Sequence, residues 1–222
     1  MILDLHTHHL APYPEGIISV SPATLPDDVG RQLYSIGFHP WHLPLTGLSA
    51  SDITMLAERA LRSDVAAIGE CGIDLARDGA APLAIQMIAF RKHVEISESV
   101  GKPLIIHCVK AHDIIISLKK ELKPAQRWII HGFRGKPSIL KMLISAGIAV
   151  SYGEKFNPDS VAATPVESLF AETDESTRSI SEIIAGLQAV NPAVTPRLIS
   201  SNIAAAIPLK DEADTTPETG IL

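Results

Sequence analysis

Eight short apolar runs recur along the chain, and stretches with helical periodicity separate most of them. Strands that alternate with helices are typical of a parallel sheet, because parallel neighbours need a long crossover connection. The predicted strands are Ile2 to Leu5, Gly16 to Val20, Tyr34 to Phe38, Val65 to Gly69, Pro103 to Ile106, Arg127 to Ile130, Gly147 to Ser151 and Ser168 to Ala171. Eight strands in 222 residues predict a single-domain α/β fold, a (β/α)8 TIM barrel trimmed below the roughly 250 residues usual for it. An open doubly wound sheet is the alternative.

The segments between the strands complete this picture. The predicted helices are Asp52 to Ser63, Leu83 to Val100, Ala111 to Leu122, Pro137 to Ala146 and Ile180 to Val190. Gly101 and Gly147 stand where helices should end, because glycine tolerates the left-handed conformation of a helix C-terminus. The proline-bearing segment from Ser21 to Leu33 should hold little helix, which shortens the barrel. We assign residues 1–209 to the barrel domain and the polar, aperiodic residues 210–222 to a flexible tail.

Composition excludes several classes of protein. With 46% apolar residues the chain is not a disordered protein, and two cysteines exclude a disulfide scaffold. A net charge of −6 argues against a general nucleic-acid clamp, so any attraction to phosphate must be local or come from a metal ion. The sequence carries neither a secretory signal pattern nor an apolar run of roughly 20 residues for a membrane span. We therefore expect a cytoplasmic protein with no membrane partner.

Side chains that can bind metal follow the predicted strands. His6 and His8 lie two residues apart after the first strand, so both point to the same side, although such a pair is weak evidence in a chain with nine histidines. The same pattern returns at later strand ends. The six candidate ligands are His6, His8, Glu70, His107, His131 and Asp174.

These six side chains favour the closed barrel over the open sheet. They come from strands 1, 4, 5, 6 and 8, and such a spread converges only if the sheet closes, at the rim where barrel active sites lie. Polar groups at the ends of buried strands also need partners, because their desolvation is costly. Six ligands suit two divalent ions that share a carboxylate. Zinc fits four imidazoles best, with magnesium or manganese as alternatives.

We divide the candidate ligands between the two ions. His6, His8 and Asp174 would bind one ion, His107 and His131 the other, and Glu70 would bridge them. A hydroxide activated by the metal would be the nucleophile, because bound metal lowers the pKa of water. Asp174 is the candidate to orient this nucleophile and accept its proton, and Glu70 is the second catalytic candidate.

At this point the chain resembles a known family, the TatD-type metal-dependent deoxyribonucleases of the metallo-dependent hydrolase superfamily. The matching stretches, in the family's order, are Asp4-Leu5-His6-Thr7-His8, Gly37-Phe38-His39-Pro40-Trp41, Ala67-Ile68-Gly69-Glu70-Cys71-Gly72-Ile73-Asp74, Pro103-Leu104-Ile105-Ile106-His107-Cys108, Ile130-His131-Gly132-Phe133-Arg134-Gly135 and Glu172-Thr173-Asp174.

The resemblance implies a TIM barrel with one or two metal ions that hydrolyses phosphodiester bonds in DNA, often trimming strand ends as an exonuclease does. It places the family's ligand roles on the same six residues and puts His39 near the substrate. The chain also departs from the family. Val109 and Lys110 stand where the family has an arginine, and a helix follows Asp174 where a proline and a longer loop are expected. The reaction class therefore transfers better than the substrate.

Other polar residues receive narrower expectations. Lys110 is a candidate to hold a substrate phosphate, with a solvated rim charge as the alternative. Asp4 could support a metal ligand or make a buried structural contact. His93 and His112 lie within predicted helices, where we expect surface positions.

Three functions remain open from the sequence. The first is a metal-dependent hydrolase acting on a DNA end. The second uses the same metal chemistry on a small ester, amide or phosphoester, and the altered loops favour it. The third is a barrel that binds metal or a partner without catalysis.

Overall fold

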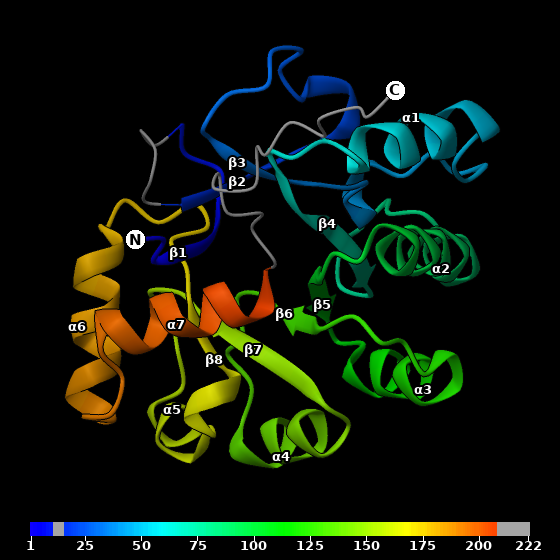
Figure 1. The fold of residues 1–222 in the computed structure, drawn as a ribbon. Coiled ribbons are helices and arrows are strands. Elements are labelled where there is room, and N and C mark those ends of the chain that lie inside the picture. Colours follow the sequence, from blue (N-terminus) through cyan, green and yellow to red (C-terminus); the bar gives the residue numbers. More distant parts are fainter. Residues whose placement is uncertain (11–15, 208–222) are drawn as a thin grey trace, which may run out of the picture.

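In the computed structural model, residues 1–10 and 16–207 are described, and they form a β-barrel surrounded by helices (Figure 1). Eight parallel strands follow one another round a single sheet in chain order. The strands are β1 (Asp4–Thr7), β2 (Gly16–Val20), β3 (Leu33–Ile36), β4 (Val65–Asp74), β5 (Leu104–Val109), β6 (Trp128–Ile130), β7 (Ile148–Tyr152) and β8 (Leu169–Ala171). This order confirms the predicted TIM barrel and rules out the open doubly wound sheet.

Helices lie around the outside of these strands, and the last helix crosses one end of the barrel (Figure 1). They are α1 (Ala50–Ala60), α2 (Leu83–Val100), α3 (His112–Leu122), α4 (Pro137–Ser145), α5 (Pro158–Ala163), α6 (Ile180–Val190) and α7 (Pro196–Ala206), with short 3₁₀ turns η1 (Pro22–Thr24), η2 (Pro40–His42) and η3 (Val166–Ser168). The segment between β2 and β3 holds only η1, as predicted. Helices α5 and α7 were not predicted.

Helix ends follow local capping chemistry. Helix α1 begins two residues before its predicted start, because the Ser49 hydroxyl accepts the Asp52 N–H while the Asp52 carboxylate accepts the Ser49 N–H. Helix α2 ends at Val100 and is capped by Gly101, with φ of 69°, and Gly147 follows α4 with φ of 72°, as the sequence predicts.

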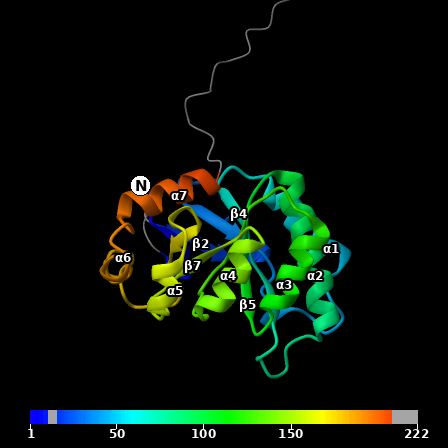
Figure 2. The ribbon, with the colours of Figure 1, turned by 90° about the horizontal axis from the view of Figure 1, so that it is seen from below.

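Helix α7 closes the end of the barrel opposite the candidate site (Figure 2). Its Asn202 side chain donates to the carbonyl oxygens of Val166 and Leu169, where β8 begins. Below it the core is fully buried and includes Trp128, Tyr152 and Phe170. The carboxyl ends of the strands therefore remain the open face of the molecule.

Strand β4 runs beyond its predicted end and carries Glu70 inside the strand rather than after it. The β4–β5 pairing shifts register between Ile68 and Cys71 and then continues to the end of both strands. Gly72 permits this close pairing: its φ is 152°, and a Cβ there would collide with the backbone of His107. Pairing with β5 therefore fixes the β4 backbone before Glu70, at Ile68, and after it, from Cys71 onward.

A seam between β1 and the segment after β8 closes the barrel. Thr7 and Asp174 form a parallel bridge, in which the His8 N–H donates to the Asp174 carbonyl at 3.1 Å and the Asp174 N–H to the His6 carbonyl at 2.9 Å. The Asp4 carboxylate reinforces this seam by accepting the Thr173 N–H at 2.9 Å and its hydroxyl at 2.6 Å. Of the two roles considered for Asp4, the structure shows the buried structural contact.

The prediction that His93 lies at the surface is wrong. His93 lies on α2 and is fully buried, not on the surface, because both ring nitrogens are satisfied there. Its Nε2 accepts the Phe38 N–H at 2.9 Å, and its Nδ1 lies 2.8 Å from the Ala89 carbonyl. Burial lowers the pKa of His93 from 6.5 to about 4.

The predicted tail at 210–222 lies outside the described residues, and the boundary at residue 209 stays a prediction. None of the helices within 1–10 and 16–207 combines the length and the apolar character needed to cross a bilayer.

The buried His93 predicts acid sensitivity. The unfolded chain protonates this imidazole near pH 6.5 and the folded chain only near pH 4, so stability is full above pH 6.5 and falls between these values by about 3 kcal/mol. Urea unfolding from pH 7 to pH 4 should show this loss in the parent protein. His93→Gln should be less stable at pH 7 and lack that part of the pH dependence; an unchanged pH dependence in the variant would contradict the prediction.

Candidate metal centre

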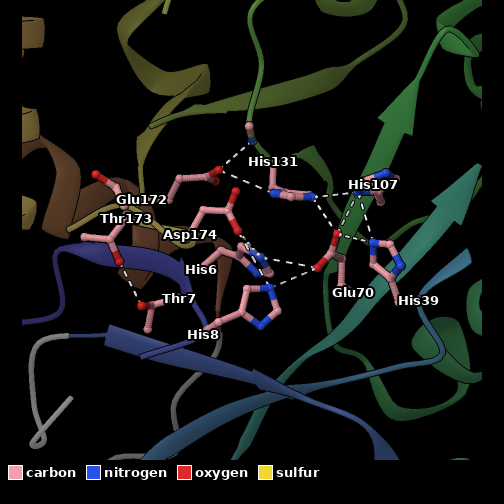
Figure 3. Close-up of polar contacts among 12 residues, drawn as sticks. His6, Thr7, His8, His39, Glu70, His107, His131, Glu172, Thr173 and Asp174 are labelled. Atoms are coloured by element: carbon pink, nitrogen blue, oxygen red, sulfur yellow. Dashed lines mark hydrogen bonds and ion pairs between the residues drawn. The ribbon is translucent and has the colours of Figure 1, made fainter. Parts of the chain in front are cut away.

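The Glu70 carboxylate lies at the centre of the candidate site, with histidines on both sides (Figure 3). It projects from β4 and is only 5% exposed. All six predicted ligands gather around it at the open end of the barrel: His6 from β1, His8 just after β1, Glu70 from β4, His107 from β5, His131 just after β6 and Asp174 after β8.

One half of the site has the spacing of ligands around a cation. The Nε2 atoms of His6 and His8 both lie 3.4 Å from Glu70 Oε2, and 3.8 Å and 3.7 Å from Asp174 Oδ1. Two atoms each about 2.1 Å from one tetrahedral zinc ion lie about 3.4 Å apart. These contacts are also long for hydrogen bonds. The four side chains therefore fit a shared divalent ion.

The His6 ring supports the same interpretation. It is fully buried, and neither of its nitrogens has a hydrogen-bond partner among the described residues. An unpaired polar atom in a protein interior costs free energy, so buried nitrogens of this kind are expected where a ligand or an ion completes the site.

The other half of the site surrounds Glu70 Oε1. His107 Nδ1 and His131 Nε2 each lie 2.7 Å from this oxygen, and His39 Nε2 lies 3.0 Å from it. His39 also lies 3.2 Å from His107 Nδ1. The sequence placed His39 only near the substrate, whereas the structure makes it a third imidazole of this half, and it is 16% exposed.

The charges of the site depend on one another. Burial alone would raise the pKa of Glu70, but His131, His107 and His39 hold it well below its usual range. For His131 burial acts in the opposite direction and would lower its pKa. The neighbouring Glu70 and Glu172 carboxylates outweigh burial, so the pKa of His131 is raised well above its usual value. Glu70 is therefore anionic, which is the form in which a carboxylate binds a divalent cation.

Two buried carboxylates behind the histidines were missed by the sequence analysis as site residues. Asp74 Oδ2 lies 3.0 Å from His107 Nε2, and Glu172 Oε1 lies 3.4 Å from His131 Nδ1 and accepts the Gly132 N–H at 2.6 Å. A signal was available, because Asp74 has the strand parity of Glu70, and Glu172 stands two residues before Asp174.

Two hollows open beside the centre. The larger, about 520 Å³, is lined by Glu70, Asp174 and His39 and extends past Trp41 and Thr24. The smaller, about 330 Å³, lies on the other side of Asp174 and includes Arg134 and Lys155. Trp41 is 43% exposed and donates its indole N–H to Asp74 Oδ2 at 2.6 Å. Lys110 is exposed with φ of 53° and lines neither hollow, so its substrate contact stays a prediction.

Comparison with known proteins identifies the family. A family profile described as "TatD related DNase" matches residues 25–201, which is most of the chain. The chain belongs to this TatD-related family. The resemblance deduced from the sequence motifs is therefore confirmed.

Individual relatives of this TatD-family chain are more distant. An uncharacterized metal-dependent hydrolase of Buchnera aphidicola is 28% identical over 150 residues, covering 64% of this chain and 55% of the relative. A protein of Erwinia amylovora named 3'-5' ssDNA/RNA exonuclease TatD is 28% identical over 149 residues, covering 62% of this chain and 56% of the relative. The chain thus spans a little over half the length of the curated relatives it matches.

Solved structures agree on the fold. The crystal structure of YJJV, a TatD homolog from Escherichia coli K12, superimposes with a TM-score of 0.76 at 18% identity and covers 93% of this chain and 97% of that one. A TatD family hydrolase from Entamoeba histolytica gives a TM-score of 0.71 at 14% identity and covers 94% and 98% of the two chains. At these identities the likeness supports the barrel alone.

The geometry predicts that metal stabilises this TatD-family protein. Zinc that binds only the folded chain should raise the free energy of unfolding by about 3 kcal/mol when its free concentration is a hundred times its Kd. Urea unfolding with added zinc and with a chelator measures the difference. Glu70→Ala should lose most of this increment, whereas Glu58→Ala, an exposed change on α1, should keep it. Equal stability of the parent protein with and without zinc would contradict the metal centre.

Proposed function

We propose that the chain is a metal-dependent hydrolase of the TatD type that cleaves phosphodiester bonds, with a DNA strand end as its substrate. One observation carries this proposal: a single buried carboxylate, Glu70, faces imidazoles with both of its oxygens, and Asp174 lies at the open side of the same cluster. Several relatives, including those from Erwinia, are named as 3'-5' ssDNA/RNA exonucleases, and that name supports a nucleic-acid substrate here.

The ligand roles follow from the two halves of the site. His6, His8 and Asp174 would hold one ion, His107 and His131 the other with His39 beside them, and Glu70 would bridge the two. Zinc is the proposed metal because imidazole nitrogens dominate the set, and magnesium or manganese are the alternatives. When bound, such ions lower the pKa of water and neutralise charge on the phosphate.

Asp174 has the geometry of a general base. It is 28% exposed and lines both hollows. Its Oδ1 faces His6 and His8, while no hydrogen bond or ion pair to its Oδ2 occurs within the described part of the chain. Oδ2 is therefore free to accept the proton of the attacking water. Glu70 is buried and multiply contacted, so its role is to hold the cluster together and not to exchange protons.

The larger hollow is the proposed substrate site. At about 520 Å³ it has room for the end of a strand, and Trp41 gives it an aromatic wall beside His39. The chain as a whole carries a net charge of −6, so attraction to phosphate must come from the ions at the centre. Short contact with a strand end fits this charge distribution better than tracking along a duplex. Free thiols at Cys71 and Cys108 suit the cytoplasm as the proposed location.

The proposal predicts loss of nuclease activity without loss of fold. Asp174→Asn should lower kcat on a single-stranded oligonucleotide by about 10²- to 10⁴-fold, because it removes the proton acceptor. Glu70→Ala should abolish activity together with metal content. The measurements are metal content, oligonucleotide cleavage and hydrolysis of a chromogenic phosphodiester.

A matched control separates these effects from contamination. Asp113→Asn changes an exposed aspartate in the first turn of α3 and should leave cleavage unchanged. Cleavage that survives both site variants would reveal a contaminating nuclease and overturn the mechanism. Activity confined to small esters or phosphoesters would replace the DNA substrate, and bound metal without hydrolysis of any substrate would favour a non-catalytic barrel.

A further inference from the structure

We propose that Asp74 is a positioning residue that fixes the ring of His107 for metal binding and, with the same carboxylate, fixes Trp41 at the wall of the larger hollow. This inference rests on the proposed metal centre and adds a residue to it. Asp74 is the last residue of β4 and is 3% exposed. Its side chain lies behind His107, on the side of the ring away from Glu70.

Each oxygen of this carboxylate has a separate task. Oδ2 accepts the Trp41 indole N–H at 2.6 Å and lies 3.0 Å from His107 Nε2. Oδ1 accepts the backbone N–H groups of Ala76 at 2.7 Å and Arg77 at 3.1 Å. All four contacts are with N–H groups or a ring nitrogen, so the two oxygens of Asp74 act as acceptors in four directions.

The contact with His107 determines which ring nitrogen can bind metal. A carboxylate can only accept a hydrogen bond, so the nitrogen that faces Asp74 must carry the proton. That nitrogen is Nε2. Nδ1 faces Glu70 at 2.7 Å on the cluster side of the ring, so Nδ1 is the nitrogen that would exchange its proton for a metal ion. A carboxylate behind a ligating histidine also makes the ring a stronger ligand.

The contact with Trp41 ties the substrate wall to the same residue. The indole ring lies 5.7 Å from the His107 ring and 4.8 Å from the His39 ring. The Arg77 guanidinium lies over the indole at 4.5 Å, and its backbone is held by Asp74 Oδ1. Asp74 thus determines where the metal ligand, the aromatic wall and the neighbouring cation lie.

Asp74→Asn tests the proposal because it keeps the size of the side chain and changes only its hydrogen bonding. The amide oxygen can still accept the loop N–H groups, but the amide NH₂ then faces two donors, the Trp41 indole and the His107 Nε2–H. We expect zinc affinity at the His107 half of the site to fall by about 10- to 100-fold, measured by competition with a chelator. We also expect Trp41 emission to shift and become easier to quench, while the fully buried Trp128 contributes a constant background.

Two variants separate positioning from general stability. Asp64→Asn removes a carboxylate that is 2% exposed and is paired with Arg62 at 2.6 Å, just before the other end of β4. It should lower the free energy of unfolding and leave zinc affinity unchanged. Trp41→Phe removes one donor to Asp74 but preserves the contact with His107, so zinc affinity should stay near that of the parent.

The outcomes distinguish this inference from the proposed function. If the parent protein binds zinc and cleaves the oligonucleotide but Asp74→Asn keeps the parent's zinc affinity, the positioning role is wrong and the function stands. If Asp64→Asn lowers zinc affinity as much as Asp74→Asn does, the effect is only structural and the proposal is overturned. If the parent protein binds none of zinc, manganese and magnesium, the metal centre and this inference both fail.

Discussion

Closure of the sheet between β1 and the segment after β8 is the constraint on which the whole site depends. The His8 and Asp174 backbone N–H groups make this seam, and the side chains of His6, His8 and Asp174 point from it toward Glu70. In an open sheet, β1 and β8 would stand at opposite edges, and these side chains would lie far apart. Asp4 and Thr173 add side-chain hydrogen bonds directly beneath the seam. The barrel closes and half of the site forms through the same few residues.

The second requirement is electrostatic. An anionic Glu70 that is 5% exposed is tolerated only because imidazoles surround both of its oxygens. This cluster of Glu70 and imidazoles can bind a cation. The protein as a whole has a net charge of −6 and repels a polyanion, so the cation would supply the local attraction. Two more carboxylates, Asp74 and Glu172, lie behind His107 and His131 and give these rings a fixed orientation. His107 and His131 therefore each lie between two carboxylates, with Glu70 on one side and Asp74 or Glu172 on the other.

Much of the architecture could be predicted because the strands are apolar and five of the eight carry a ligand-type side chain near the carboxyl end. The positions of Glu70 and His107 inside longer strands could not, since the extension depends on the register shift between β4 and β5. Buried His93 was misjudged because a polar residue in a helix was taken to face solvent, whereas backbone groups of Phe38 and Ala89 satisfy both ring nitrogens in the interior. Helix α7 was missed although Thr195 caps it and Pro196 begins it. Its role in covering the barrel floor arises only from tertiary packing.

The seam also sets an order of assembly. It joins Thr7 to Asp174, so β1 must wait for nearly the whole barrel to be synthesised before it acquires its second neighbour. Glu70, His107 and His131 come from strands that are adjacent in the chain, and their half of the site can gather earlier. A nascent chain would therefore hold an incomplete, histidine-rich cluster until its last strand arrives. Asp174 follows that strand, and its backbone pairing with β1 brings Asp174 next to His6 and His8, so full metal-binding capacity reports that the barrel has closed.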